Sequence, residues 1–224
     1  MEIFLDTANI DEIKAILPWG VISGLTTNQK IFSCEKGVNF KERVMEILKL
    51  VKGPVSIEVT KTTGTDQELV EEAKEYAGWG SNIVIKIPMW SDGRGLRVAS
   101  TLRDLGIKTN ITCLMSTNQM ILATKVGATY ASLFFNRIKD SKEDPLRAIS
   151  ESRQIIEESG SATKIIVGSI RKPEDVSEAV VAGAHVMTIP YKILVQMPFH
   201  LKTEETIKEF DTAWLEFKKS EKCK

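Results

Sequence analysis

Apolar residues along the chain follow two alternating patterns. Short runs rich in β-branched residues, typical of strands covered on both faces, alternate with longer stretches that have the three-to-four-residue spacing of an amphipathic helix. The runs predict strands near Glu2–Leu5, Val21–Gly24, Val55–Val59, Asn82–Ile87, Lys108–Ile111, Thr129–Phe134, Lys164–Gly168 and His185–Ile189. The stretches between them predict helices near Ile10–Leu17, Phe40–Val51, Asp66–Tyr76, Leu96–Leu105, Thr117–Val126, Pro145–Glu158 and Pro173–Val181.

Strands that alternate with helices run parallel, because each helix carries the chain back to the start of the next strand. Eight such units in 224 residues favour a closed barrel over an open doubly wound sheet. The first strand is followed by Asp6-Thr7-Ala8-Asn9, which lacks the glycine-rich fingerprint of dinucleotide-binding folds. We therefore expect an α/β fold in which residues 1–224 form a single (β/α)8 TIM barrel domain.

Two further helical stretches, Lys192–Pro198 and Thr203–Lys218, follow the eighth predicted strand. The second stretch places Phe210, Trp214 and Phe217 on one face at helical spacing. This aromatic stripe predicts either packing on the chain's own barrel or docking on a neighbouring subunit. The expected domain thus ends in an extra C-terminal helix over residues 203–218.

Composition and charge narrow the possible functions. The 30 basic and 30 acidic residues cancel, so the chain offers no electrostatic reason to expect nucleic acid or a membrane surface as a partner. No run is long enough to cross a membrane, and the first residues do not resemble a signal peptide. The scattered Cys34, Cys113 and Cys223 fit neither a disulfide framework nor a metal site, and two histidines are too few for a typical catalytic zinc. We expect a cytoplasmic protein without a bound metal.

Seven consecutive predicted strands end in, or run into, functional side chains that are mostly polar. Catalytic groups of (β/α)8 barrels project from the carboxyl ends of the strands, and unpaired polar groups in a barrel core are costly. Core packing alone therefore does not account for this arrangement. The residues are Asp6, Thr26-Thr27-Asn28, Glu58, Lys86, Asn110 and Thr112, Ser132 and Phe134, and Ser169 and Arg171.

Lys86 lies within the apolar run Ile83–Pro88. Desolvation lowers the pKa of a lysine, and a neutral amine can attack a ketone to form a Schiff base. Asp6 and Glu58 on other strands favour this chemistry, because Schiff-base formation and carbon–carbon cleavage both require proton transfer. The alternatives are that the lysine extends to solvent or pairs with an acid, and that the two carboxylates are structural ion-pair partners.

Other side chains at the same rim suit a phosphorylated sugar. Asn110 and Ser132 can hydrogen-bond to hydroxyls, while Arg137 and Arg171 offer guanidinium groups that bind phosphate in a bidentate manner. Ser169 follows the seventh strand, a region where barrels commonly bind phosphate near a helix N-terminus. The alternative is that both arginines are ordinary surface residues.

Several short motifs occur in an order that resembles one known family. They are Phe4-Leu5-Asp6-Thr7-Ala8, Gly24-Leu25-Thr26-Thr27-Asn28, Ile85-Lys86-Ile87-Pro88, Thr109-Asn110-Ile111-Thr112, Gly127-Ala128-Thr129-Tyr130 and Gly168-Ser169-Ile170-Arg171. Each motif is weak alone, but the ordered set resembles the small transaldolases and the related fructose-6-phosphate aldolases over essentially the whole chain.

The resemblance implies that Lys86 carries a dihydroxyacetone unit as a Schiff base. It implies that Asp6 is the acid–base group at the cleaved hydroxyl, and that Glu58 and Thr112 position a water that shuttles protons. It assigns sugar hydroxyls to Asn28, Asn110 and Ser132, and the phosphate to Arg137, Ser169 and Arg171. It also implies no metal or organic cofactor, and a homo-oligomer, pentamer or decamer, in which the C-terminal helix reaches a neighbour.

Two positions separate the two branches of this family. The transaldolases have Glu and Phe at the positions of Glu58 and Phe134, where the aldolases have Gln and Tyr. We therefore expect transfer of a dihydroxyacetone unit from sedoheptulose 7-phosphate or fructose 6-phosphate to glyceraldehyde 3-phosphate or erythrose 4-phosphate, in the non-oxidative pentose phosphate pathway. The alternatives are an aldolase that releases free dihydroxyacetone, and a sugar-phosphate-binding barrel without catalysis.

The chain departs from the family pattern at two places. Gln29-Lys30 stands where Pro-Ser is common, and Val167-Gly168 stands where alanines are common. Both departures bear on the preferred acceptor sugar and leave the expected catalytic residues in place.

Overall fold

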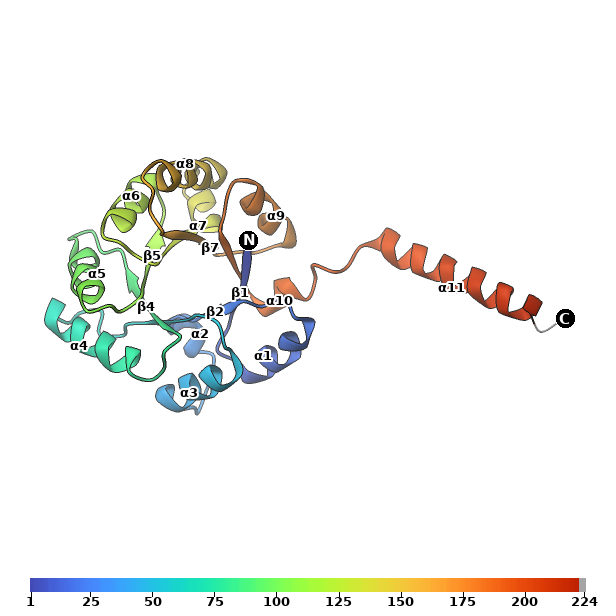
Figure 1. Cartoon of the computed structure of the whole chain (residues 1–224), viewed down its shortest axis with the longest axis horizontal. Helices are drawn as coiled ribbons and strands as arrows, with labels where there is room; N and C mark the ends of the chain where they lie inside the picture. The colour runs from blue at the N-terminus through green and yellow to red at the C-terminus, as the bar shows by residue number, and fades with distance from the viewer. Residues whose placement is uncertain (222–224) are drawn as a thin grey trace.

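The computed structural model describes residues 1–221, in which eight parallel strands close into a barrel in chain order (Figure 1). The strands are β1 (Glu2–Asp6), β2 (Gly24–Thr26), β3 (Val55–Glu58), β4 (Ile83–Pro88), β5 (Thr109–Leu114), β6 (Tyr130–Phe134), β7 (Lys164–Gly168) and β8 (Val186–Ile189). β1 pairs with both β2 and β8, which closes the ring. The predicted (β/α)8 barrel is confirmed.

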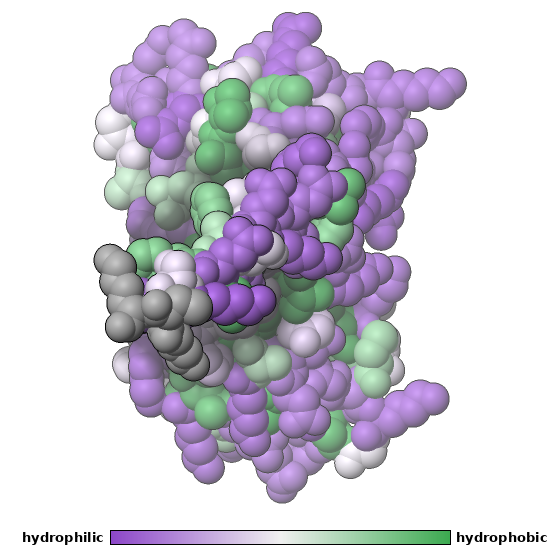
Figure 2. All heavy atoms as spheres, turned by 90° about the vertical axis from the view of Figure 1, so that its right-hand side faces the viewer, coloured by the Kyte–Doolittle hydropathy of each residue, from purple (hydrophilic) through white to green (hydrophobic). Residues whose placement is uncertain are grey.

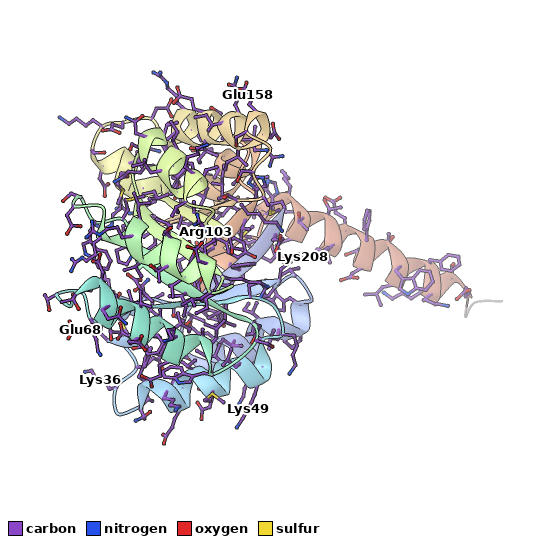
Figure 3. The ribbon with its side chains drawn as sticks, turned by 60° about the vertical axis from the view of Figure 1, so that its left-hand side comes forward. Lys36, Lys49, Glu68, Arg103, Glu158 and Lys208 are labelled. Atoms are coloured by element: carbon purple, nitrogen blue, oxygen red, sulfur yellow. The ribbon has the colours of Figure 1, made fainter. Side chains whose placement is uncertain are left out.

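Seven helices cover the outside of the barrel (Figure 1) within the described residues. They are α1 (Ile10–Ile16), α3 (Phe40–Leu50), α4 (Asp66–Ala77), α5 (Arg94–Asp104), α6 (Thr117–Lys125), α8 (Pro145–Glu158) and α9 (Pro173–Val181). Most begin at a side chain that accepts hydrogen bonds from the first turn, such as Asn39 before α3 and Thr65 before α4. Charged side chains of the outer helices point away from the barrel, as Lys49, Glu68 and Glu158 do in Figure 3.

The main hydrophobic core lies between the barrel and this ring of helices, and Ile57, Ile85 and Ile111 are fully buried in it. A second, smaller cluster of buried residues consists of Phe4, Val84, Tyr130, Ile166 and Val186. None of these five residues lies at the carboxyl end of its strand. The apolar residues thus leave the carboxyl ends of the strands to the polar side chains predicted there.

The bounds predicted for the second strand, 21–24, are wrong: the strand lies at Gly24–Thr26, so it begins three residues later and ends two residues later. Val21 is 43% exposed, whereas Leu25 and Thr26 are buried. The backbone N–H of Leu25 donates to Pro54 O at 2.8 Å, so the residues that join the sheet lie C-terminal to the exposed Val21. β5 also runs further than predicted, through an irregularity in pairing at which Cys113 has φ 63°.

Three short elements were not predicted. They are α2 (Gln29–Phe32) and α7 (Phe135–Asp140), which follow strands, and the 3-10 helix η1 (Leu17–Trp19), which follows α1. Each is too short to show an amphipathic period. Of the predicted stretch Lys192–Pro198, only the beginning is helical, as part of α10 (Tyr191–Leu194).

The last helix, α11 (Leu201–Glu221), projects away from the barrel (Figure 1) and contains no buried residue. It is longer than the predicted range and does not pack on the chain's own barrel. Figure 2 looks at the molecule from the side on which α11 projects, and it shows hydrophobic side chains exposed among hydrophilic ones. None of the helices within residues 1–221 is long and apolar enough to cross a membrane.

Candidate active site

A cavity of about 470 Å³ opens among the carboxyl ends of the strands. Its walls carry eight of the side chains that the sequence pattern singled out. These are Asp6, Thr26, Asn28, Lys86, Ser132, Phe134, Arg137 and Ser169. The predicted convergence of strand-end residues is therefore present for this part of the set, while Glu58, Asn110, Thr112 and Arg171 lie outside the lining.

Lys86 is buried in the barrel, with only 5% of its surface exposed. Its place on β4, opposite Glu58 of β3, brings the two side chains together. The Lys86 Nζ atom lies 3.6 Å from Glu58 Oε2 and donates a hydrogen bond of 2.9 Å to the backbone oxygen of Thr27. The amine thus faces the cavity while both a carboxylate and a carbonyl oxygen stabilise it.

Burial raises the pKa of both carboxyl groups near this lysine. Asp6 is held in place by Thr26, whose hydroxyl donates to Asp6 Oδ1 at 2.7 Å. Desolvation raises the pKa of Asp6, and the charge of Lys86 and this hydrogen bond oppose the rise only in part. Desolvation likewise raises the pKa of Glu58 against the opposing charge of Lys86. Both groups therefore retain protons at higher pH than ordinary carboxyls, which suits acid–base work.

Polar side chains behind the lining form a buried hydrogen-bond network. Ser132 Oγ donates to Asn110 Oδ1 at 2.7 Å, and Asn110 Nδ2 donates to Ser56 Oγ at 3.1 Å. Asn110 therefore reaches the cavity through Ser132. The hydroxyl of Thr112 is buried and has no hydrogen-bond partner within residues 1–221. It stands beside the irregularity of β5 at Cys113.

The two arginines are placed differently. Arg137 follows β6 and lines the cavity, as does Ser169 after β7. Arg171 is exposed, and its guanidinium holds both carboxylate oxygens of Asp140, with Nη1 at 2.8 Å from Oδ1. The backbone N–H groups of Arg171 and Lys172 both donate to Asp175 Oδ2. A side chain of the chain itself therefore occupies the N-terminal end of α9, where the sequence predicted a phosphate.

Lys30, at one of the two departures from the family pattern, lines the cavity and adds positive charge to it. Further cavity residues were not predicted: Lys192 adds a second positive charge, and Cys34 and Thr188 also contribute to the lining. Lys192 lies three positions after β8, so the rule that strand ends supply functional groups applies to it as well. The sequence pattern instead placed Lys192 in a helical stretch and gave no sign of a role in the cavity.

Gln29, a departure from the family pattern, contacts the strand that bears Glu58. Its Nε2 atom donates to Val59 O at 2.8 Å, and hydrogen bonding by Gln29 is among the influences that lower the pKa of Glu58. Both residues line a neighbouring cavity of about 320 Å³ whose walls include Phe32 and Phe40.

The part of the chain that the structure describes contains no cluster of three His, Cys, Asp or Glu side chains suited to a metal ion. Cys34 and Cys113 are free thiols, and Cys223 lies outside the described residues.

Comparison with known proteins gives a consistent result. The family model "Transaldolase/Fructose-6-phosphate aldolase" matches residues 3–223. A "Probable transaldolase" of Carboxydothermus hydrogenoformans is 46% identical over 220 residues, which cover 98% of this chain and 100% of the relative. Proteins with the same description are 42% identical in Streptococcus equi subsp. zooepidemicus, over 98% of this chain and 100% of the relative, and 44% identical in Moorella thermoacetica, over 96% and 97%. The chain, with its lysine-bearing cavity at the mouth of a closed barrel, belongs to the transaldolase/fructose-6-phosphate aldolase family.

Proposed function

We propose that the protein is a transaldolase that moves a dihydroxyacetone unit between sugar phosphates through a Schiff base on Lys86. The observation that carries this proposal is the buried Lys86 amine, which lines the cavity 3.6 Å from Glu58. Asp6 lines the same cavity, so a base and a nucleophile face the same space. The "Probable transaldolase" relatives support the same activity.

In the first half of the reaction, Lys86 Nζ attacks the ketone carbon of sedoheptulose 7-phosphate or fructose 6-phosphate, and water leaves as the Schiff base forms. Glu58 and the buried Thr112 hydroxyl position the water that carries protons in this step. Asp6 then takes the proton of the C4 hydroxyl as the C3–C4 bond breaks. The bonding electrons remain on the three-carbon enamine, and an aldose phosphate leaves.

In the second half, the enamine adds to the aldehyde of glyceraldehyde 3-phosphate or erythrose 4-phosphate, and Asp6 returns its proton to the new hydroxyl. Water then hydrolyses the Schiff base and frees the new ketose. Phe134 lines the cavity and has no proton to give to the enamine. This favours transfer over release of free dihydroxyacetone, the aldolase reaction.

Arg137, Ser169 and Arg171 hold the phosphate in this proposal, while Asn28, Ser132 and Asn110 serve the sugar hydroxyls. Arg137 and Ser169 are in place, and Arg171 joins them by exchanging Asp140 for the substrate phosphate. The reaction requires no metal or organic cofactor.

We also propose that the protein works in the cytoplasm, in the non-oxidative pentose phosphate pathway, as a homo-oligomer, a pentamer or decamer. The exposed stripe of α11 supports the last point. Trp214 and Phe217 stack on each other with ring centroids 5.4 Å apart, yet both are at least half exposed. A surface of this kind gains stability when a neighbouring subunit covers it.

A transfer assay separates the candidate reactions. The protein is incubated with fructose 6-phosphate, with and without erythrose 4-phosphate, and glyceraldehyde 3-phosphate is followed. Formation over many turnovers that depends on erythrose 4-phosphate supports the transaldolase. Sustained formation without it, together with free dihydroxyacetone, identifies an aldolase. No product in either mixture favours a barrel that only binds sugar phosphates.

The nucleophile is tested by borohydride reduction in the presence of fructose 6-phosphate. We expect a stable adduct on wild-type protein and none on Lys86→Ala, because reduction fixes a Schiff base to the amine that formed it. Lys108→Ala is the matched control, since Lys108 lies outside the cavity and should not affect trapping. Mass spectrometry that locates the adduct on another lysine would remove Lys86 from its role.

A further inference from the structure

A single buried side chain, Asn136 of α7, links this short helix, which also carries Arg137, to the turn that carries Ser169. Asn136 Nδ2 donates to the backbone oxygen of Ser169 at 2.8 Å and to Asp175 Oδ2 at 2.6 Å. The backbone N–H of Asn136 also donates to Ser169 O, at 3.4 Å. Asn136 is 7% exposed and Asp175 is fully buried. The helix after β6 is thus tied to the turn after β7.

The backbone of Ser169 needs such support. Its φ is 60°, in the left-handed region that residues with a Cβ atom seldom adopt. Residues in this region persist only where their surroundings hold them there, and they cluster at ligand sites. Both hydrogen bonds to the Ser169 oxygen come from Asn136, so Asn136 is well placed to hold this conformation.

Asp175 completes the arrangement from the first turn of α9. Its Oδ2 atom accepts from Asn136 Nδ2 and from the backbone N–H groups of Arg171 and Lys172. Its Oδ1 atom is buried without a partner within residues 1–221. A carboxylate close to an anion site repels the anion, so the charge of Asp175 does not favour phosphate binding. Its hydrogen bonds therefore point to a role in holding the surrounding backbone in place.

We propose that Asn136 and Asp175 are positioning residues that fix the spacing of Arg137 and Ser169 and thereby set the affinity for the phosphorylated end of the sugar. The inference rests on the proposed function, since it concerns the phosphate of that substrate. Neither residue lines the cavity, so both act through their neighbours. The register between β6 and β7 supports this proposal. Their last residues, Phe134 and Gly168, are partners in the sheet, so the segments that follow the two strands start side by side.

Binding of inorganic phosphate, measured by titration calorimetry, tests the proposal without requiring turnover. We expect Asn136→Ala to weaken phosphate binding roughly tenfold, the loss typical of a well-placed charged or hydrogen-bonded contact. Asp175→Asn removes the charge but keeps a side-chain oxygen that can accept hydrogen bonds from the same groups, so it should bind phosphate within about threefold of wild type. Asn39→Ala is the matched control, because it removes the cap of α3 and lowers stability away from the cavity.

Steady-state kinetics gives a second measurement. In Asn136→Ala, KM for fructose 6-phosphate should rise roughly tenfold while kcat stays within about twofold, since the affected contact holds the substrate throughout the reaction. KM for unphosphorylated dihydroxyacetone as donor should not change. Asn136→Ser replaces the alanine variant if that protein does not fold.

The proposal is overturned if folded Asn136→Ala binds phosphate like wild type, or if Asn39→Ala weakens binding equally. It is also overturned if Asp175→Asn loses as much affinity as Asn136→Ala, because the charge would then matter more than the geometry. If no variant and no wild-type protein shows transfer, the proposed reaction fails, but the phosphate titrations still decide the positioning role.

Discussion

At the scale of single residues, three ionisable groups lie close together at or just behind the cavity wall. Asp6, Glu58 and Lys86 come from β1, β3 and β4. Burying charge is costly even when the charges are partly matched. Here the cost is visible in the raised pKa of both carboxyl groups. Such a cost is expected where the groups serve chemistry and do not serve stability.

Replacing Asp6 by Asn should therefore stabilise the protein at neutral pH. The pKa of Asp6 is raised on folding, so its contribution to stability is greatest below the ordinary carboxyl range and is lost as pH rises through the folded pKa. The stability gained by Asp6→Asn should thus grow as the pH rises from the ordinary carboxyl range toward neutrality. Urea unfolding of both proteins across this range measures the gain.

The matched control is Asp66→Asn on α4. A hydrogen bond from Arg97 lowers the pKa of Asp66, so the sign reverses. Its ionised form favours folding above the ordinary carboxyl range, and the variant should be no more stable than wild type at neutral pH. If Asp6→Asn proved less stable than wild type throughout the range, the carboxylate of Asp6 would be structural.

The two arginines give a second test at this scale. Arg137→Ala should raise KM for fructose 6-phosphate by a factor of roughly ten to a hundred, because the cavity loses a cation that lines it. Arg171→Ala should raise it less, because Arg171 must first give up Asp140. Initial rates over a range of fructose 6-phosphate concentrations measure both. A larger effect of Arg171→Ala would show that the exchange with Asp140 is complete in the bound state.

Strand-end position predicted much of the site, but positioning residues required the structure. Asp6, Lys86, Ser132 and Ser169 follow the alternation of buried strands, so their common location can be predicted from the sequence. Asn136 has no such signal. It lies in a helix of six residues, and its partners Ser169 and Asp175 are distant in the sequence.

At the scale of elements, strands and long helices were predicted well because burial gives them a clear period. The second strand was misplaced because exposed Val21 resembles a strand residue, whereas Thr26 forms the sheet. Short helices carry little periodicity. In α11 the apolar stripe was predicted, but whether it packs on its own barrel depended on the chain between Leu194 and Leu201.

Removal of the chain from residue 199 onward should leave a folded barrel and change its assembly. The removed α11 contains no buried residue, so the core of the remaining chain is intact. Light scattering with size-exclusion chromatography should show fewer subunits per particle than for the full chain, and circular dichroism should show a cooperative unfolding transition.

Trp214→Ser should also lower the number of subunits per particle, because it removes from the stripe an aromatic residue that is 58% exposed. Lys208→Ala, elsewhere on α11, is the matched control and should not alter particle size. An unchanged number of subunits in the truncated protein would exclude α11 from the subunit contact.

At the scale of the whole molecule, barrel closure explains how such distant residues meet. The strands follow one another around the ring in chain order, so each contributes one rim position without any long crossing connection. The number and order of strands can be predicted from the alternating pattern. The way in which Glu58, Asn110 and Thr112 stand behind the lining cannot, because it depends on strand tilt and on the irregularity at Cys113.

The pairing of β1 with β8 also has a consequence for folding during synthesis. Glu2 pairs with Val186, so β1 must wait for β8, the last strand of the barrel, before both its edges are covered. Until then β1 offers an unpaired edge to other chains, a known route to aggregation. α11 follows β8 in the chain, so the strand that closes the ring is synthesised before the exposed aromatic stripe. The edge that the barrel must close and the stripe that would meet a neighbour thus become available at different stages of synthesis.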